Sequence, residues 1–220
     1  MMIGMSKIKS IVLLALTMDL SQLMAIAYCN DIEVLKLTYS LCKLAVERDI
    51  KGCFVEAGTA WGAHGIIMNE FDRRVFLFDS FEGIPEYTKE DKEFTESWGA
   101  SGGDVRKSSG ITVCRQEDVE MTMRRYSDIQ HVRFVKGWFA DTLPKFNQQI
   151  AVLRLDCDIY HSYADCFKYL LPLLADGGFL IIDDYCLSGC QQAMAEAGLD
   201  HTKFNKFNNI AWATHTKQPR

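Results

Sequence analysis

Gly52-Cys-Phe-Val-Glu-Ala-Gly58-Thr-Ala-Trp-Gly62 is the stretch that decides the fold, since a short apolar run ends here at an acid and continues into a glycine turn. Such a run, bounded by glycines, predicts a buried strand. Residues 64–71 can form a helix directly after it. The stretch therefore predicts a strand–turn–helix unit, whose glycines let the backbone approach a ligand at the N-terminus of the helix.

Four more apolar runs repeat this pattern and turn polar at their carboxyl ends. They are Arg74–Asp79, His131–Lys136, Ile150–Asp156 and Gly178–Asp183. Strands that alternate with helical segments predict a mostly parallel sheet with helices on both faces, and such sheets bind ligands outside the carboxyl ends of their strands. Without repeats or linkers, residues 1–220 are predicted to form one Rossmann-like α/β domain whose acids converge on one rim.

Composition and charge limit the classes of function. The 220 residues are 48% hydrophobic and 24% charged, with a formal net charge of −5, which is typical of one globular domain with a buried core. No Lys/Arg-rich run offers a surface for a phosphate backbone, so we expect no nucleic-acid partner. The eight cysteines are scattered, which favours buried free thiols and the reducing cytoplasm.

Helices are predicted for the N-terminal part, residues 1–50. Lys7 precedes the apolar run Ile11–Met18, as in a signal peptide, but a membrane span needs roughly 20 apolar residues. We therefore expect no membrane association and favour an amphipathic helix that packs on the domain or on a second subunit. Residues 32–46 have helical spacing of apolar side chains. A homo-oligomer formed through these helices is a hypothesis.

A long connection, residues 86–130, separates the second and third predicted strands. It contains the glycine- and serine-rich runs Gly99–Asp104 and Ser108–Gly110, and it exceeds an ordinary loop in length. Residues 117–126 have helical spacing and are predicted to pack on the sheet. The connection is interpreted as an inserted lid over the site.

Two acids at strand ends indicate a cofactor. Glu56 stands where a dinucleotide-binding turn would have its first glycine, and it is a poor neighbour for a pyrophosphate. Asp79 closes the next strand, where an acid commonly accepts hydrogen bonds from ribose hydroxyls. Together they favour a nucleoside-like cofactor without phosphate. The alternative, strand-end acids satisfied by helix N-termini or solvent, stays open at this point.

Four further carboxylates follow two apolar strands: Asp156, Asp158, Asp183 and Asp184. Unpaired charges are costly to bury, so a positive group should lie between them. Oxygen ligation by Asp156, Asp183 and Asp184 suits Mg²⁺ or a similar divalent cation. The alternative for Asp183 and Asp184 is a purely structural role in helix capping or a turn. Asp158 is a candidate general base or a cap of the helix predicted over 160–171.

Two other side chains are candidates near this rim. His161 lies one helical turn from the acids and is a second candidate for the base or for a substrate contact. Trp138 follows the Gly137 turn and could line a pocket, although aromatic residues near strand ends more often belong to the core.

Several strings together resemble the macrocin O-methyltransferase family. They are Phe54–Gly58, Phe78-Asp-Ser-Phe-Glu-Gly-Ile-Pro85, Phe134–Pro144, Leu155–Tyr160 and Asp176–Tyr185. The Asp-Ser-Phe-Glu-Gly string is far more specific than the glycine turn. The resemblance covers roughly residues 50–190, in the family's order.

This resemblance implies a class I methyltransferase with a seven-stranded sheet that moves the methyl group of S-adenosylmethionine (AdoMet) to a hydroxyl of a sugar or another small hydroxylated natural product, as in antibiotic biosynthesis. It implies Mg²⁺ at both oxygens of a vicinal diol. The matching metal ligands are Asp156, Asp183 and Asp184, and Asp158 matches a suggested base. The matching cofactor residues are Glu56, Ala57, Gly58, Asp79, Ser80, Gly137, Trp138 and Asp156.

Two positions depart from the family pattern, since Ala63 and Cys157 stand where glycine is common. Cys157 adds bulk beside the expected cofactor, and the chain diverges after Gly189. Two alternatives therefore stand beside the O-methyltransferase: a metal-dependent, hydroxylase-like biosynthetic enzyme of related fold, and a non-catalytic binding protein. The intact set of acids argues against the latter, because clustered charges are tolerated only for a reason.

Overall fold

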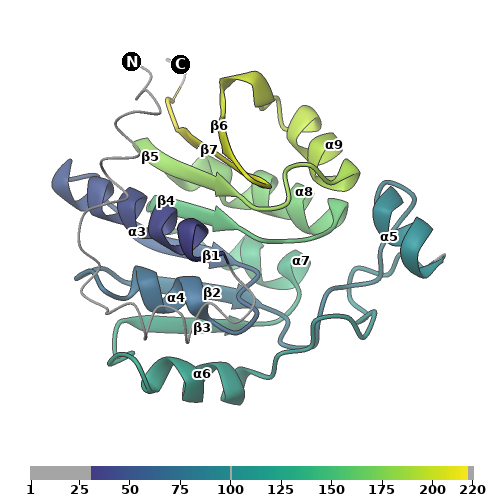
Figure 1. Ribbon diagram of the computed structural model, residues 1–220, viewed down its shortest axis with the longest axis horizontal. Helices are drawn as coiled ribbons and strands as arrows, with labels where there is room; N and C mark the ends of the chain where they lie inside the picture. The colour runs from purple at the N-terminus through teal and green to yellow at the C-terminus, as the bar shows by residue number, and fades with distance from the viewer. Residues whose placement is uncertain (1–30, 100, 218–220) are drawn as a thin grey trace.

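The sheet has seven strands in the order β3-β2-β1-β4-β5-β7-β6, in a computed structural model that describes residues 31–99 and 101–217. Neighbours from β3 to β5 are parallel, and β7 pairs antiparallel with both β5 and β6. The strands are β1 (Cys53–Ala57), β2 (Val75–Asp79), β3 (Val132–Lys136), β4 (Ile150–Leu155), β5 (Leu174–Ile182), β6 (Asn205–Phe207) and β7 (Ile210–Thr214). The predicted mostly parallel, seven-stranded α/β sheet is confirmed (Figure 1).

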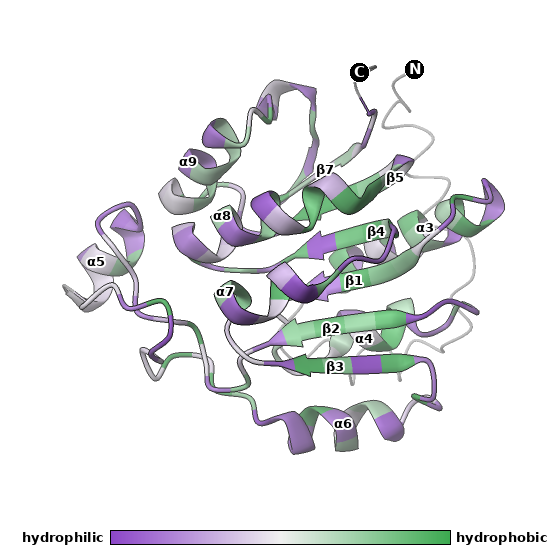
Figure 2. Cartoon of the chain, turned by 180° about the vertical axis from the view of Figure 1, so that it is seen from behind, coloured by the Kyte–Doolittle hydropathy of each residue, from purple (hydrophilic) through white to green (hydrophobic). Residues whose placement is uncertain are grey.

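Helices cover both faces of the sheet. Figure 1 shows α3 and α4 in front of it and α6 along its β3 edge, and Figure 2, from behind, shows α7, α8 and α9 on the other side. Each face has its own apolar cluster, which is why the central strands are buried along their whole length and mostly apolar. The helices are α3 (Ile32–Glu47), α4 (Ala63–Met68), α5 (Lys92–Trp98), α6 (Gln116–Arg124), α7 (Phe139–Thr142), α8 (Tyr160–Tyr169) and α9 (Ser188–Glu196), with short 3-10 turns at Leu143–Lys145, Leu171–Leu173 and His201–Lys203.

Register across four adjacent strands places the acids on one rim. Ala57 of β1 pairs with Phe78 of β2 and with Leu155 of β4, which in turn pairs with Ile182 of β5. The next residue in each strand is therefore Asp79, Gly58, Asp156 and Asp183 in spatial order. Because parallel strands end at the same edge, the predicted convergence of these positions is confirmed.

Most element boundaries lie within two residues of those predicted from the sequence. The helix predicted over 64–71 is α4, which ends three residues earlier, at Met68, and the other exception is β5. The strand begins at Leu174 rather than at Gly178, because its first part continues pairing with Ile150 across a register shift. Such an irregularity tolerates the glycines at 177 and 178 inside the strand. The predicted helix over 117–126 is α6, two residues shorter at its end.

The long connection leaves the sheet at its carboxyl edge, where α5 projects away from the strands (Figure 1). Asp91, just before α5, accepts a hydrogen bond from the Tyr160 backbone N–H at 2.7 Å and so fastens the connection to the start of α8. Val105 and Thr112 line the cavity described below. Part of the connection thus reaches the site, and closure of residues 86–130 as a lid stays a prediction.

Expectations for the N-terminal part are tested only in part. The helix over 32–46 is confirmed as α3, with Asp31 capping its first turn, whereas the amphipathic helix expected at 11–18 lies outside the described residues. Within residues 31–99 and 101–217, no helix is long and apolar enough to cross a membrane. Seven described cysteines are free, and six of them are buried.

Candidate active site

The glycine turn after β1 lies directly against the end of β4. Gly58 has φ +85°, and a Cβ atom there would lie 1.7 Å from the carbonyl oxygen of Asp156. Only glycine fits both the left-handed backbone and this close approach. Gly58 is therefore required by the structure of the turn. The close approach of Gly58 to Asp156 also places the predicted cofactor residues beside the predicted metal ligands.

Asp79 closes the glycine turn through backbone hydrogen bonds. Its Oδ2 accepts from the N–H groups of Thr59, at 2.7 Å, and Ala60, at 3.4 Å, and its Oδ1 accepts from Phe81 at 2.7 Å. Burial raises the pKa of Asp79, and these hydrogen bonds lower it. Backbone N–H groups of the protein therefore satisfy this carboxylate, as the alternative to a cofactor role predicted. Asp79 also lines the cavity described below, where a ligand can reach it.

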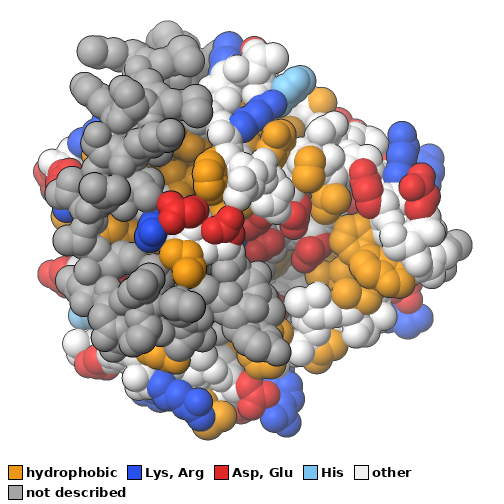
Figure 3. All heavy atoms as spheres, in the orientation of Figure 1, with side chains coloured by type: hydrophobic (Ala, Val, Ile, Leu, Met, Phe, Trp, Pro, Cys, Tyr) orange, Lys and Arg blue, Asp and Glu red, His pale blue; other side chains and the backbone are white. Residues whose placement is uncertain are grey.

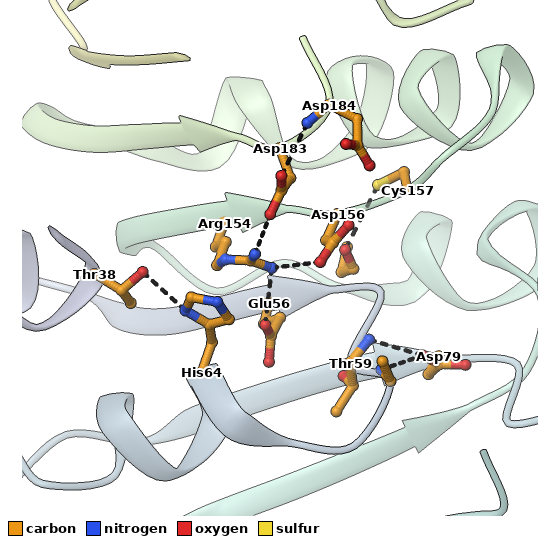
Figure 4. Close-up of polar contacts among 12 residues, drawn as sticks. Thr38, Glu56, Thr59, His64, Asp79, Arg154, Asp156, Cys157, Asp183 and Asp184 are labelled. Carbon is orange, nitrogen blue, oxygen red and sulfur yellow. Dashed lines mark hydrogen bonds and ion pairs between the residues drawn. The ribbon is translucent and has the colours of Figure 1, made fainter. Parts of the chain in front are cut away.

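Arg154 of β4 is completely buried and joins three acids (Figure 4). Its Nη1 donates to Glu56 at 3.1 Å and to Asp156 at 3.0 Å, and its Nη2 donates to Asp183. Arg154 therefore supplies part of the positive charge that the clustered acids require. Burial raises the pKa of Glu56 to about 8, and Arg154 opposes this rise.

The adjacent acids Asp183 and Asp184 share one partner, Asn209, and Asp183 also binds Arg154. Asp183 Oδ2 accepts from Arg154, while its Oδ1 accepts from the Asp184 backbone N–H at 3.0 Å and from Asn209 at 3.1 Å. Asp184 accepts from the same Asn209 nitrogen at 2.8 Å. Burial raises the pKa of Asp183 to about 7, an effect that Asp156 reinforces and Arg154 opposes.

Three carboxylates converge closely enough to hold an ion. One oxygen each of Asp156, Asp158 and Asp184 lies within 4.8 Å of the others. The structure thus groups two predicted ligands with the predicted base, while Asp183 is directed at Arg154. Desolvation first, and then the charge of Asp156, raise the pKa of Asp158 well above its usual range.

A cavity of about 210 Å³ opens at this rim, and acidic side chains gather around the hollow at the middle of the face in Figure 3. Seven of the predicted site residues line it: Gly58, Asp79, Ser80, Trp138, Asp156, Asp158 and His161. Ser80 also shapes the turn, because its Oγ donates to the Gly83 carbonyl at 2.8 Å.

The lining of the cavity does not include the other five predicted residues. They are Glu56, Ala57, Gly137, Asp183 and Asp184. Glu56 and Ala57 are buried in β1, and the Gly137 N–H donates to the Asp79 carbonyl at 2.9 Å. The cofactor and metal roles of all these residues stay predictions.

Sequence reasoning missed Arg154 and Asn209. The signal for Arg154 was available, since an arginine inside the apolar run Leu153–Leu155 must be buried with partners. Asn209 gave no such signal, because a turn asparagine is ordinary and only the antiparallel hairpin brings it to the acids.

Comparison with known proteins decides the family. A family model described as macrocin O-methyltransferase matches residues 34–215. The chain belongs to the macrocin O-methyltransferase family. The resemblance read from the sequence strings is thereby confirmed.

Named relatives of this family member are O-methyltransferases. 8-Demethyl-8-(2,3-dimethoxy-alpha-L-rhamnosyl)-tetracenomycin-C 4'-O-methyltransferase of Streptomyces olivaceus is 35% identical over 154 residues, which are 66% of this chain and 57% of the relative. Demethyldecarbamoylnovobiocin O-methyltransferase of Streptomyces niveus is 32% identical over 161 residues, 69% of this chain and 60% of the relative. The chain therefore spans about three fifths of the length of these curated relatives.

The solved structure of the O-methyltransferase NovP resembles this macrocin O-methyltransferase family member in fold. The two share 26% sequence identity at a TM-score of 0.72, over 84% of this chain and 81% of NovP. The expected Rossmann-like methyltransferase fold is confirmed.

Proposed function

We propose that this protein is a metal-dependent O-methyltransferase that moves the methyl group of AdoMet to a hydroxyl of a sugar or another small hydroxylated natural product. The observation that carries the proposal is one cavity lined by both the glycine turn with Asp79 and the acids Asp156 and Asp158. Family membership and the names of the relatives support it.

Buried atoms without partners favour AdoMet as the cofactor. Among the described residues, Glu56 Oε2 and Thr59 Oγ1 are buried and have no hydrogen-bond partner, which is costly unless a ligand supplies one. AdoMet has an ammonium group and ribose hydroxyls that match an acid and a hydroxyl. When bound, AdoMet supplies an electrophilic methyl group. Glu56, Ala57, Gly58, Asp79, Ser80, Gly137, Trp138 and Asp156 would hold it.

Carboxylate oxygens at the ends of β4 and β5 suit a hard divalent cation such as Mg²⁺. Asp156, Asp183 and Asp184 would hold it. Asp156 and Asp184 converge, and the Oδ1 atoms of Asp183 and Asp184 share one donor nitrogen, so both face the same side. When bound, the metal lowers the pKa of a substrate hydroxyl and orients it.

The chain's own acids handle the proton. Asp158 lines the cavity, and one of its carboxylate oxygens lies within 4.8 Å of those of Asp156 and Asp184, beside the place where the substrate hydroxyl would be held. We assign it the base role, with His161, on the same wall, as a contact to the substrate. Arg154 keeps Glu56 and Asp156 in fixed positions between the two halves of the site.

Reaction in the cytoplasm and a homo-oligomer complete the proposal. Free, mostly buried thiols favour a reducing compartment. The small-molecule acceptor is best sought among glycosylated natural products, since one relative's name includes a rhamnosyl group.

Calorimetric titration with S-adenosylhomocysteine, and transfer of radiolabelled methyl from AdoMet to a panel of rhamnosides with and without EDTA, test this function. We expect binding of S-adenosylhomocysteine and transfer that EDTA abolishes and Mg²⁺ restores. Absence of binding at millimolar ligand would overturn the cofactor half. Transfer unchanged by EDTA would overturn the metal half.

A further inference from the structure

Asn209 connects the C-terminal hairpin to the two acids at the end of β5. It lies in the turn between β6 and β7, and its exposed side chain points one amide nitrogen at both carboxylates, at 3.1 Å from Asp183 and 2.8 Å from Asp184. An amide nitrogen has two protons, so both are used. The amide therefore fixes the two neighbouring carboxylates relative to each other.

The backbone of the same residue reinforces this link. The Asn209 carbonyl accepts a hydrogen bond from the Tyr185 N–H at 3.2 Å, directly after the acid pair. Asp184 has φ +48°, a left-handed conformation that aspartate adopts only at some cost. Contacts on both sides of Asp184 thus hold a backbone that would otherwise relax.

We propose that Asn209 is a positioning residue of the metal site, which holds the Asp183–Asp184 pair in the orientation that binds a divalent cation. The inference rests on the metal half of the proposed function. A carboxylate oxygen can accept a hydrogen bond and still donate a lone pair to a metal. Partners that orient ligating carboxylates commonly change metal affinity by about 10- to 100-fold when removed.

The neighbouring asparagine provides a matched control. Asn208 occupies the same turn, but its amide donates to Asp31, at 2.8 Å, rather than to the acid pair. Its φ is +52°, so Asn208→Gly removes the amide without backbone strain. Asn209→Ala removes the other amide from an equally exposed position.

The test is Mn²⁺ titration, by calorimetry and by electron paramagnetic resonance, of the full chain and both variants without substrate. We expect Mn²⁺ affinity at least about tenfold weaker in Asn209→Ala and unchanged within about twofold in Asn208→Gly. S-adenosylhomocysteine affinity and melting temperature, measured on the same samples, should match those of the wild type and so exclude misfolding.

Each other outcome overturns the inference. Equal Mn²⁺ affinities in wild type and Asn209→Ala, or tighter binding in the variant, would show that the amide does not orient the ligands. Equal losses in both variants would assign the effect to the turn as a whole. A wild-type protein that binds no Mn²⁺ would overturn the metal half of the proposed function as well.

Discussion

Arg154 pairs with Glu56 across two adjacent strands, in register, with 3.1 Å between Nη1 and Oε1 and both side chains 0–1% exposed. The same guanidinium reaches Asp156 and Asp183. One buried cation therefore links the acid predicted to face the cofactor with the acids predicted to hold the metal. Its single positive charge also compensates part of the negative charge of these three acids.

Replacing Arg154 with methionine should destabilise the fold, because it leaves buried acids without their counter-charge. Removing one partner of a buried pair costs about 3 kcal/mol or more. Urea unfolding followed by circular dichroism measures this loss. Arg106→Met is the matched control, since Arg106 pairs with Asp141 at the surface and should cost at most about 1 kcal/mol. Equal stabilities for the two variants would contradict a structural role for the buried network.

Replacing Gly58 with alanine should disrupt the glycine turn far more than the same change at Gly110. The two residues have nearly the same φ, +85° and +83°, but a Cβ atom at Gly110 meets nothing within 4 Å. Gly110→Ala should therefore cost only the backbone strain, about 1–2 kcal/mol. Gly58→Ala adds a clash with the Asp156 carbonyl and should lose folding or S-adenosylhomocysteine binding. Similar melting temperatures for both variants would show that the turn can move away from β4.

Most of the strands and of the candidate site could be predicted from apolar runs in the sequence and from the polar residues at their ends. β1 to β4 were found within a residue or two because each is a short, mostly apolar run that ends at a polar residue or a glycine turn. Convergence of Asp79, Asp156 and Asp183 followed from parallel pairing alone. Side-chain direction did not follow, since Asp183 turns to Arg154 while Asp158 turns to Asp156 and Asp184. Asn209 depends on a hairpin whose pairing no periodicity reveals.

Replacing Asp79 with asparagine should weaken the binding of S-adenosylhomocysteine by about tenfold or more. The amide retains one acceptor oxygen and turns an NH₂ group toward backbone donors, either those of Thr59 and Ala60 or that of Phe81. Loss of one hydrogen bond to a charged group costs about 1.5–3 kcal/mol. Calorimetry measures the affinity, with Asp118→Asn, a surface acid paired with Arg115, as the control. Unchanged affinity would remove Asp79 from the cofactor site.

Replacing Asp158 with asparagine separates its two candidate roles, base and metal ligand. As a base it should be dispensable for the metal, so Mn²⁺ affinity should stay within about threefold while kcat falls by about 100-fold or more. Asp184→Asn is the comparison, because a ligand change should weaken Mn²⁺ binding itself. Asp158 and Asp184 lie in one oxygen cluster with Asp156. A different effect of the two substitutions on Mn²⁺ affinity would therefore show that only one of the two carboxylates binds the metal. If Asp158→Asn loses Mn²⁺ as completely as Asp184→Asn does, Asp158 is a ligand, and His161, on the same cavity wall, becomes the residue to test as base.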